Sequence, residues 1–273
     1  MNRLQEFMTH YEPDRAESDV PVSDRCSVPV KSLVKVRFVN RHMHLSYYND
    51  RFDLREGDVV YVSGKLAGEP GVVTSVTTRF RIHTSDFEKV LVLLDLTLHG
   101  SFVQAGNWMV SFDQIPISPE RFDSWVNPPE DPKQKKQREK DGEEEDEVIS
   151  GEGYTIDIHH PERCQEMTDT IAGRALDYCE EGRVRYLCIR DGAGCAYVRG
   201  GKWYRVDFRF KDGIMTDLFC DCPCSELCKH EAAVAVTLWM LFRQSQLHEA
   251  GAFMALDRHT FLQLAARKKT IVL

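Results

Sequence analysis

The sequence predicts an α+β protein in two parts. The N-terminal half has the pattern of a small antiparallel β-barrel or sandwich, and the C-terminal half that of β-hairpins and helices around a segment rich in cysteine and histidine. Three observations lead to this prediction: short strand-like runs separated by Gly, Pro and Asp, a charged stretch between the halves, and alternating strands beside helical periodicity. We expect a flexible segment at 1–30, a barrel-like domain at 31–127, a disordered linker at 128–150 and a second domain at 151–273.

The composition is typical of an intracellular globular protein. The 273 residues suffice for two domains, and a hydrophobic content of 42% can fill their cores. The sequence has no apolar run of about 18 residues and no apolar N-terminal core of a secretory signal, so we expect a cytoplasmic protein without a membrane partner. The nine cysteines are odd in number and irregularly spaced, which favours free thiols plus a metal site over a disulfide framework.

Short alternating runs predict the strands of the N-terminal domain. Val34, Val36 and Phe38 alternate with residues expected to face away from the core, as in a half-buried strand. Further strands are expected at 44–48, 59–62, 72–76, 79–82 and 90–98.

The first two strands also carry a basic and aromatic cluster. Its members are Arg37, Arg41, His42, His44, Tyr47 and Tyr48. Such a cluster could contact a nucleic-acid strand. We favour the interpretation that the tyrosines are core residues and that the arginines solvate one face of a strand.

The linker accounts for half of the net charge of −8. Residues 128–147 hold 5 Lys and Arg against 9 Asp and Glu, which gives a net charge of −4. Prolines are the only apolar residues of this stretch, so it cannot bury enough surface to offset the loss of chain entropy. We expect a solvated tether.

A helix and four strands are expected upstream of the cysteine-rich segment. The spacing of apolar residues predicts a helix over 163–180. Strands are predicted at 184–190, 195–199, 203–210 and 214–220. In the third strand, alternate residues from Tyr204 to Phe210 are apolar, so we expect that face to be buried.

The last of these strands leads into four potential metal ligands. Cys220 and Cys222 form one pair, and Cys228 and His230 form another after a gap of five residues. Zinc favours four tetrahedral nitrogen and sulfur ligands, which two close pairs joined by a short loop can supply. Pro223 stiffens this loop, and the apolar run after His230 predicts a helix that starts at the second pair. A Cys3His site has no open position, so we expect one structural Zn2+.

This segment resembles the SWIM-type zinc finger of bacterial proteins. The family pattern of Cys-x-Cys, a variable gap and Cys-x-His corresponds here to Cys220, Cys222, Cys228 and His230. The proline, the preceding strands and the following helix also agree, so the resemblance covers roughly residues 170–245. Cys224 departs from the family pattern and forms a second Cys-x-Cys with Cys222, which makes it an alternative ligand. The resemblance implies a DNA-binding or protein-interaction module.

The remaining cysteines and a histidine pair have simpler interpretations. We expect Cys26, Cys164, Cys179, Cys188 and Cys195 to be small apolar core residues. His159 and His160 lack nearby acids or thiols and are expected on the polar surface.

Local charge favours nucleic-acid binding by the second domain. Residues 182–219 contain eight Lys and Arg against four Asp, which gives a local net charge of +4. The third strand places Trp203 on the same face as basic residues, a combination that suits base stacking. The expected contacts are Trp203, Arg205, Arg209, Arg199 and Lys229. The alternative is a solvated sheet face with Trp203 packed on the helix.

Three functions are compatible with these features, and none is enzymatic. The first is a zinc-stabilised accessory factor that binds DNA or RNA. The second is a protein-interaction adaptor beside a helicase or within a larger complex, which the net charge of −8 favours. The third is a zinc-thiol redox sensor that uses Cys224. The sequence lacks a glycine-rich phosphate loop and a nucleophile–base pair, so we expect no enzyme and no small-molecule substrate.

Overall fold

The chain folds into two compact units. The computed structural model describes residues 3–5, 15–20, 31–38, 41–96, 98, 100–128, 154–244 and 252–270. The first unit combines Met1–Val22, Leu98–Pro119 and Val148–Thr270, and the second combines Ser23–Thr97, Glu120–Glu147 and Ile271–Leu273. The division therefore differs from the expected boundaries, because residues 98–119 belong with the C-terminal part. Cys26 and the expected linker, apart from Pro128, lie outside the described residues.

The second unit is built on an antiparallel sheet of five strands in the order β3-β2-β5-β4-β6. These strands are β2 (Ser32–Phe38), β3 (Met43–Asn49), β4 (Val59–Val62), β5 (Gly71–Thr77) and β6 (Val90–Leu93). Val34, Val36 and Phe38 are buried in the core of this unit, as their alternation predicted. The region of β6 meets β3 in a single isolated bridge between Tyr48 and Lys89. The antiparallel sheet is thus confirmed, but the described residues do not form a closed barrel.

Two expected strands of this unit differ from the structure. Residues 79–82 form no strand, because the chain passes there through a bend toward the short 3-10 helix Thr84–Asp86. The last strand ends at Leu93, well before residue 98.

Burial distinguishes the two interpretations of the basic and aromatic cluster at residues 37–48. Tyr47 and Tyr48 are core residues with exposed fractions of 4% and 7%. Arg41 pairs with Glu69, with 2.6 Å between Nη2 and Oε1. The cluster therefore offers no exposed tyrosine ring for base stacking.

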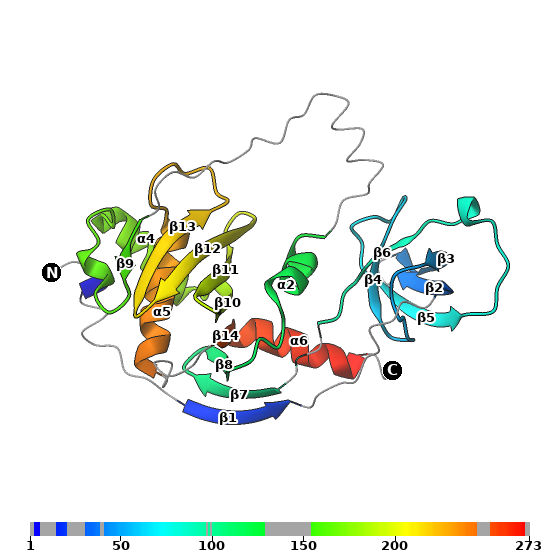
Figure 1. Cartoon of the computed structure of the whole chain (residues 1–273), viewed down its shortest axis with the longest axis horizontal. Helices are drawn as coiled ribbons and strands as arrows, with labels where there is room; N and C mark the ends of the chain where they lie inside the picture. Colours follow the sequence, from blue (N-terminus) through cyan, green and yellow to red (C-terminus); the bar gives the residue numbers. More distant parts are fainter. Residues whose placement is uncertain are drawn as a thin grey trace. The chain divides into compact units, whose positions relative to one another are not determined.

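The first unit contains an antiparallel sheet of nine strands in the order β1-β7-β8-β14-β10-β11-β12-β13-β9 (Figure 1). The strands are β1 (Arg15–Val20), β7 (Gly100–Ala105), β8 (Trp108–Phe112), β9 (Ile156–Asp157), β10 (Val184–Arg190), β11 (Ala193–Arg199), β12 (Trp203–Lys211), β13 (Ile214–Cys220) and β14 (Ala252–Asp257). β1 falls within the segment expected to be flexible and pairs with β7, so the structure differs from that expectation at residues 15–20.

Strands β10 to β13 follow one another as the sequence pattern predicts. Two connections are two-residue turns, Asp191-Gly192 with φ of 51° and 73° and Asp212-Gly213 with φ of 50° and 80°. Positive φ at both positions matches the right-handed twist of a hairpin, and Asp-Gly tolerates it well. The second turn sets the first pairs of β12 and β13, and the register then shifts by one residue between Asp207 and Arg209, so that Cys220 at the end of β13 pairs with Val206.

The helices that matter for the metal ligands are α4 (Asp169–Glu180) and α5 (Lys229–Gln244). They pack on each other, and α5 also contacts β10, β12 and β13 (Figure 1). The expected helix at 163–180 begins only at Asp169, because the Thr168 hydroxyl caps it by accepting a hydrogen bond from the backbone N–H of Ile171.

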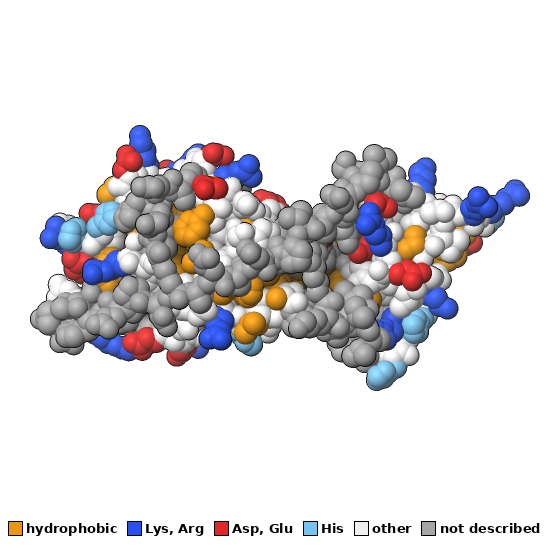
Figure 2. Space-filling model, turned by 90° about the horizontal axis from the view of Figure 1, so that it is seen from below, with side chains coloured by type: hydrophobic (Ala, Val, Ile, Leu, Met, Phe, Trp, Pro, Cys, Tyr) orange, Lys and Arg blue, Asp and Glu red, His pale blue; other side chains and the backbone are white. Residues whose placement is uncertain are grey.

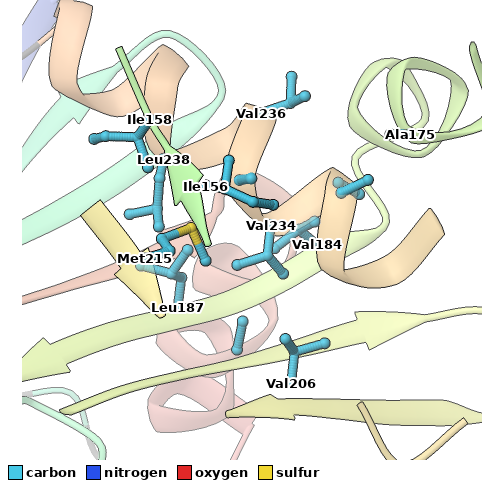
Figure 3. Packing of buried hydrophobic residues seen from close by; sticks show 14 of the residues in the cluster. Ile156, Ile158, Ala175, Val184, Leu187, Val206, Met215, Val234, Val236 and Leu238 are labelled. Atoms are coloured by element: carbon cyan, nitrogen blue, oxygen red, sulfur yellow. The ribbon is translucent and has the colours of Figure 1, made fainter. Parts of the chain in front are cut away.

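The core of the first unit lies between α5 and the sheet. Val234 and Leu238 of α5 belong to one buried cluster with Leu187 of β10 and Met215 of β13, each of them fully buried (Figure 3). α5 is buried along nearly its whole length, so its first turn is held in a fixed place at the end of the sheet.

Two further α-helices lie outside the region of the metal ligands. They are α2 (Pro119–Val126) and α6 (Arg258–Thr270). None of the helices within the described ranges has the length and apolar composition needed to cross a membrane. On the face shown in Figure 2, acidic and basic side chains are intermixed. The large hydrophobic side chains exposed in the described part of the chain are Met43, Leu45 and Leu262.

Candidate metal centre

Four buried side chains converge where β13 ends and α5 begins. Cys220 is the last residue of β13, Cys222 lies in the following turn, and Cys228 and His230 flank the first residue of α5. Their ligand atoms all lie within 4.8 Å of one another. Three sulfur atoms and one imidazole nitrogen form a donor set suited to zinc. The group could hold a metal ion, as its spacing predicted.

The distances fit a tetrahedral ion. Nδ1 of His230 lies 3.7 Å from Sγ of Cys220 and 3.6 Å from Sγ of Cys228. Bond lengths of about 2.3 Å to sulfur and 2.0 Å to nitrogen place two tetrahedral ligand atoms about 3.6 Å apart. Nδ1 of His230 and the sulfur atoms of Cys220 and Cys228 therefore already have the separation that a tetrahedral zinc ion requires.

Backbone hydrogen bonds fix both ligand pairs. Asp221, which separates the first two ligands, is bound to β12 twice: its N–H donates to the carbonyl of Arg205 at 3.1 Å, and its Oδ1 accepts from the N–H of Arg205 at 3.0 Å. At the second pair, the N–H of Cys228 donates to Oε2 of Glu231 at 2.7 Å. One pair is thus tied to the sheet and the other to the helix.

Aromatic rings enclose the histidine. The ring of Tyr204 is stacked on His230 with 4.2 Å between centroids, and the ring of Tyr178 meets His230 edge-on at 5.5 Å. Gly200 leaves room for this stack, since a Cβ there would lie 2.7 Å from Cε2 of Tyr204. His230 therefore has little freedom to rotate away from the three sulfur atoms.

Burial sets the protonation of the group. It lowers the pKa of His230 to about 4, with a smaller effect from the charge of Lys229, so the imidazole is neutral and can act as a ligand at neutral pH. Burial also raises the pKa of Cys222 to about 12. The pKa of Cys228 is raised well above its usual range, first by its hydrogen bond with Cys220 and then by burial. A metal ion must displace these thiol protons, so binding releases protons.

Cys224 does not belong to the group. It is exposed, whereas the four clustered residues are buried. Of the two possible Cys-x-Cys pairs, the structure brings Cys220 and Cys222 together with Cys228 and His230.

Cations resting on aromatic rings surround the centre. Arg199 lies over Trp203 at 5.2 Å, Lys202 over Tyr204 at 5.4 Å, and both Lys229 and Arg183 lie over Tyr178, at 5.2 and 4.9 Å. The N–H of Arg199 also donates to the carbonyl of Arg183 at 2.7 Å, which links these contacts. We call this set the cation–aromatic surface; it consists of Arg183, Arg199, Lys202, Lys229, Tyr178, Trp203 and Tyr204.

The five expected nucleic-acid contacts separate in the structure. Arg199, Trp203 and Lys229 belong to the cation–aromatic surface. Arg205 instead pairs with Asp207. Its Nε and Nη2 each donate a hydrogen bond of 2.9 Å to the Asp207 carboxylate, and these bonds raise the pKa of Arg205. Arg209 is the cross-strand partner of Ala193, far along β12 from Trp203.

Sequence reasoning missed the residues that complete this surface, namely Tyr178, Arg183, Lys202 and Tyr204. Tyr204 was assigned to the core face of β12, where it indeed lies, but its half-buried ring also stacks on the metal ligand. The available signal was the sequence Lys202-Trp203-Tyr204, which follows Arg199 after two glycines.

The other cysteines and the histidine pair lie outside the metal group. Cys188 and Cys195 are buried cross-strand partners, and Cys164 and Cys179 pack against the core cluster. Cys188 and Cys195 are therefore buried as expected, whereas Cys164 and Cys179 are only partly buried. His160 lies 3.4 Å from Glu162, and the ring of His159 meets Phe242.

Comparisons with known proteins name no relative. The chain matches no family model, no curated protein and no solved structure. The conclusions about this chain therefore depend on its own residues and on the geometry of the Cys3His group.

Proposed function

We propose that the chain is a SWIM-type zinc protein that binds nucleic acid with the cation–aromatic surface. The observation that carries this proposal is the presence of four cations on three aromatic rings around one Cys3His group. Zinc would be held by Cys220, Cys222, Cys228 and His230. A site with four protein ligands is closed, so zinc would stabilise the fold and the chain would bind its partner without catalysis.

Electrostatics supports a polyanionic partner for this surface. Arg199 and Lys202 are exposed, and among the described contacts neither forms an ion pair. Arg183 is bound to Glu181, which leaves its charge partly compensated. Lysine and arginine side chains contact phosphates without regard to sequence, and aromatic rings beside them can stack on unpaired bases. We infer that the surface binds DNA or RNA mainly through the backbone.

The test compares two double variants that remove the same charge. Arg199→Ala with Lys202→Ala removes two cations of the surface, and Arg190→Ala with Lys211→Ala removes two at the opposite ends of their hairpins. Affinity for a labelled oligonucleotide is measured by anisotropy between about 50 and 200 mM salt. With a single-stranded oligonucleotide, each lost phosphate contact reduces the magnitude of the slope of log K against log salt by about 0.7, so we expect a decrease of about 1.4 in the first variant only.

Two results would contradict the proposal. One is a wild-type protein that shows no salt-dependent binding at low salt. The other is an equal loss in both double variants, which would indicate a general charge effect.

A second candidate, a protein-interaction adaptor, is favoured by the edge strand β3. Its side chains Met43 and Leu45 are 38% and 39% exposed, and β3 ends the five-stranded sheet. Exposed apolar edge strands are ready to pair with another chain. Under this function, a stoichiometric partner co-purifies from the native source and is lost on Met43→Asp with Leu45→Asp. Retention of the partner in that variant would argue against this edge.

A further inference from the structure

The start of α5 contains a reciprocal pair of hydrogen bonds between Cys228 and Glu231. Oε2 of Glu231 accepts from the N–H of Cys228 at 2.7 Å, and the N–H of Glu231 donates to Sγ of Cys228 at 3.4 Å. In an ordinary capping box, Ser or Thr precedes the helix and Glu lies three residues later. Here a cysteine sulfur replaces the hydroxyl oxygen, and that sulfur is also a candidate metal ligand.

The burial of Glu231 indicates a role beyond helix capping. Its exposed fraction is only 5%, although carboxylates are rarely buried without a partner. Its carboxylate is bound to the backbone of one ligand, and its own N–H is bound to the sulfur of that ligand. Residues that hold a ligand from behind orient it and tune its affinity for the metal.

We propose that Glu231 is a positioning residue for the metal centre. By holding the N–H of Cys228, its carboxylate fixes the backbone just before the helix and therefore the direction of Sγ. The N–H of Glu231, at the positive end of the helix, stabilises negative charge on that sulfur. This inference rests on the metal-binding part of the proposed function and not on nucleic-acid binding.

The test uses two variants at Glu231 and a matched control in the same loop. Glu231→Ala removes the carboxylate, whereas Glu231→Gln keeps an oxygen that can accept the hydrogen bond, as Gln does in capping boxes. Glu226→Ala removes an exposed carboxylate between the two ligand pairs. The zinc dissociation constant is measured by competition with a chromophoric chelator, and the thermal unfolding of each metal-free protein is recorded alongside it.

We expect Glu231→Ala to weaken zinc binding by about 10- to 100-fold, the range found when a residue behind a metal ligand is removed. Glu231→Gln should lose less than about tenfold, and Glu226→Ala should bind as the wild type does. If Glu231→Ala does not fold, the comparison of Glu231→Gln with Glu226→Ala tests the inference instead. A positioning role predicts that Glu231→Gln binds zinc more weakly than the wild type and that Glu226→Ala binds it equally well.

Three results would overturn the inference. Zinc affinity within twofold of the wild type in both Glu231 variants would exclude a positioning role. The loss of zinc-binding free energy could equal the loss of unfolding free energy in the metal-free protein. Glu231 would then stabilise the helix and have no separate effect on the metal ligand. A wild-type chain that takes up no zinc would remove the metal centre itself, and it would do so whether or not the chain binds nucleic acid.

Discussion

The assignment of the metal ligands leads to the sharpest quantitative prediction. Cys220, Cys222 and Cys228 are buried with their sulfur atoms in one group with His230, whereas Cys224 is exposed and outside it. Substituting each cysteine by serine in turn should therefore weaken zinc binding at three positions and leave it unchanged at Cys224. The contrast is informative because all four substitutions make the same small chemical change within nine residues of sequence.

The expected magnitude follows from the number of ligands. Structural zinc binds small zinc-finger peptides with an apparent free energy of about 10–16 kcal/mol. Divided over four ligands, this is about 2.5–4 kcal/mol for each, or a loss of affinity on the order of 10²- to 10³-fold for one thiolate. Partial compensation by the serine hydroxyl or water would bring the loss toward the lower end.

The assay is competition with a chelator of known affinity, with elemental analysis after dialysis as a check on stoichiometry. The wild type should hold about one zinc per chain, because the four ligands form a single closed site. The reasoning would be refuted if Cys224→Ser weakened binding as much as Cys228→Ser, or if Cys220→Ser bound zinc like the wild type. Either result would mean that Cys222 and Cys224 form the first pair.

Two further predictions concern the stability of the first unit. Gly194→Ala places a Cβ 2.1 Å from the ring of Phe208, so thermal unfolding should show a free energy of unfolding lowered by about 1–3 kcal/mol. The control is Gly201→Ala, whose Cβ would meet nothing within 4 Å and should change the free energy of unfolding little. Equal melting temperatures for these two variants would contradict the packing described for β11 and β12. Asp257→Ala breaks the 2.7 Å pair with Arg185 and the N-cap of α6, so we expect a loss of about 3–5 kcal/mol, with a smaller loss in Asp257→Asn, which keeps a capping oxygen. An Asn variant as unstable as the Ala variant would show that the cap contributes nothing.

The sequence predicts best where neighbouring residues determine the structure. The Asp-Gly turns at 191–192 and 212–213 fix the hairpins of β10 to β13, because few other residue pairs adopt positive φ twice in succession. The metal ligands are likewise close in sequence, so their spacing alone brings them within reach of one ion. In both cases the information lies within a few residues.

Long-range pairing was not predictable in the same way. β14 lies between β8 and β10 in the sheet, although more than 100 residues separate β8 from it along the chain. Alternation identifies a strand but not its partner, so the sequence pattern placed residues 98–119 with the N-terminal domain, whereas in the structure they group with Val148–Thr270. In the second unit, Tyr48 contacts Lys89 without a continuous ladder, and a pattern of short strands cannot distinguish such an open sheet from a closed barrel.

The cation–aromatic surface was predicted only in part, for a related reason. Strand alternation correctly placed Trp203 and Arg205 on one face of β12, but it could not show that Asp207 neutralises Arg205. It also could not reveal that Tyr178 of α4 and Lys229 of α5 meet. That contact depends on how two helices pack, which the sequence of either helix does not specify.

The central claim is that a metal centre holds a nucleic-acid-binding surface in place, and one titration tests it most directly. The affinity of the zinc-loaded chain for a labelled oligonucleotide is compared with that of the same sample after chelation and after zinc is restored. Because His230 supports the rings of Tyr204 and Tyr178, on which three cations rest, we expect chelation to weaken binding by at least about tenfold, or 1.4 kcal/mol, and zinc to restore it. An affinity that is the same with and without zinc would contradict the account.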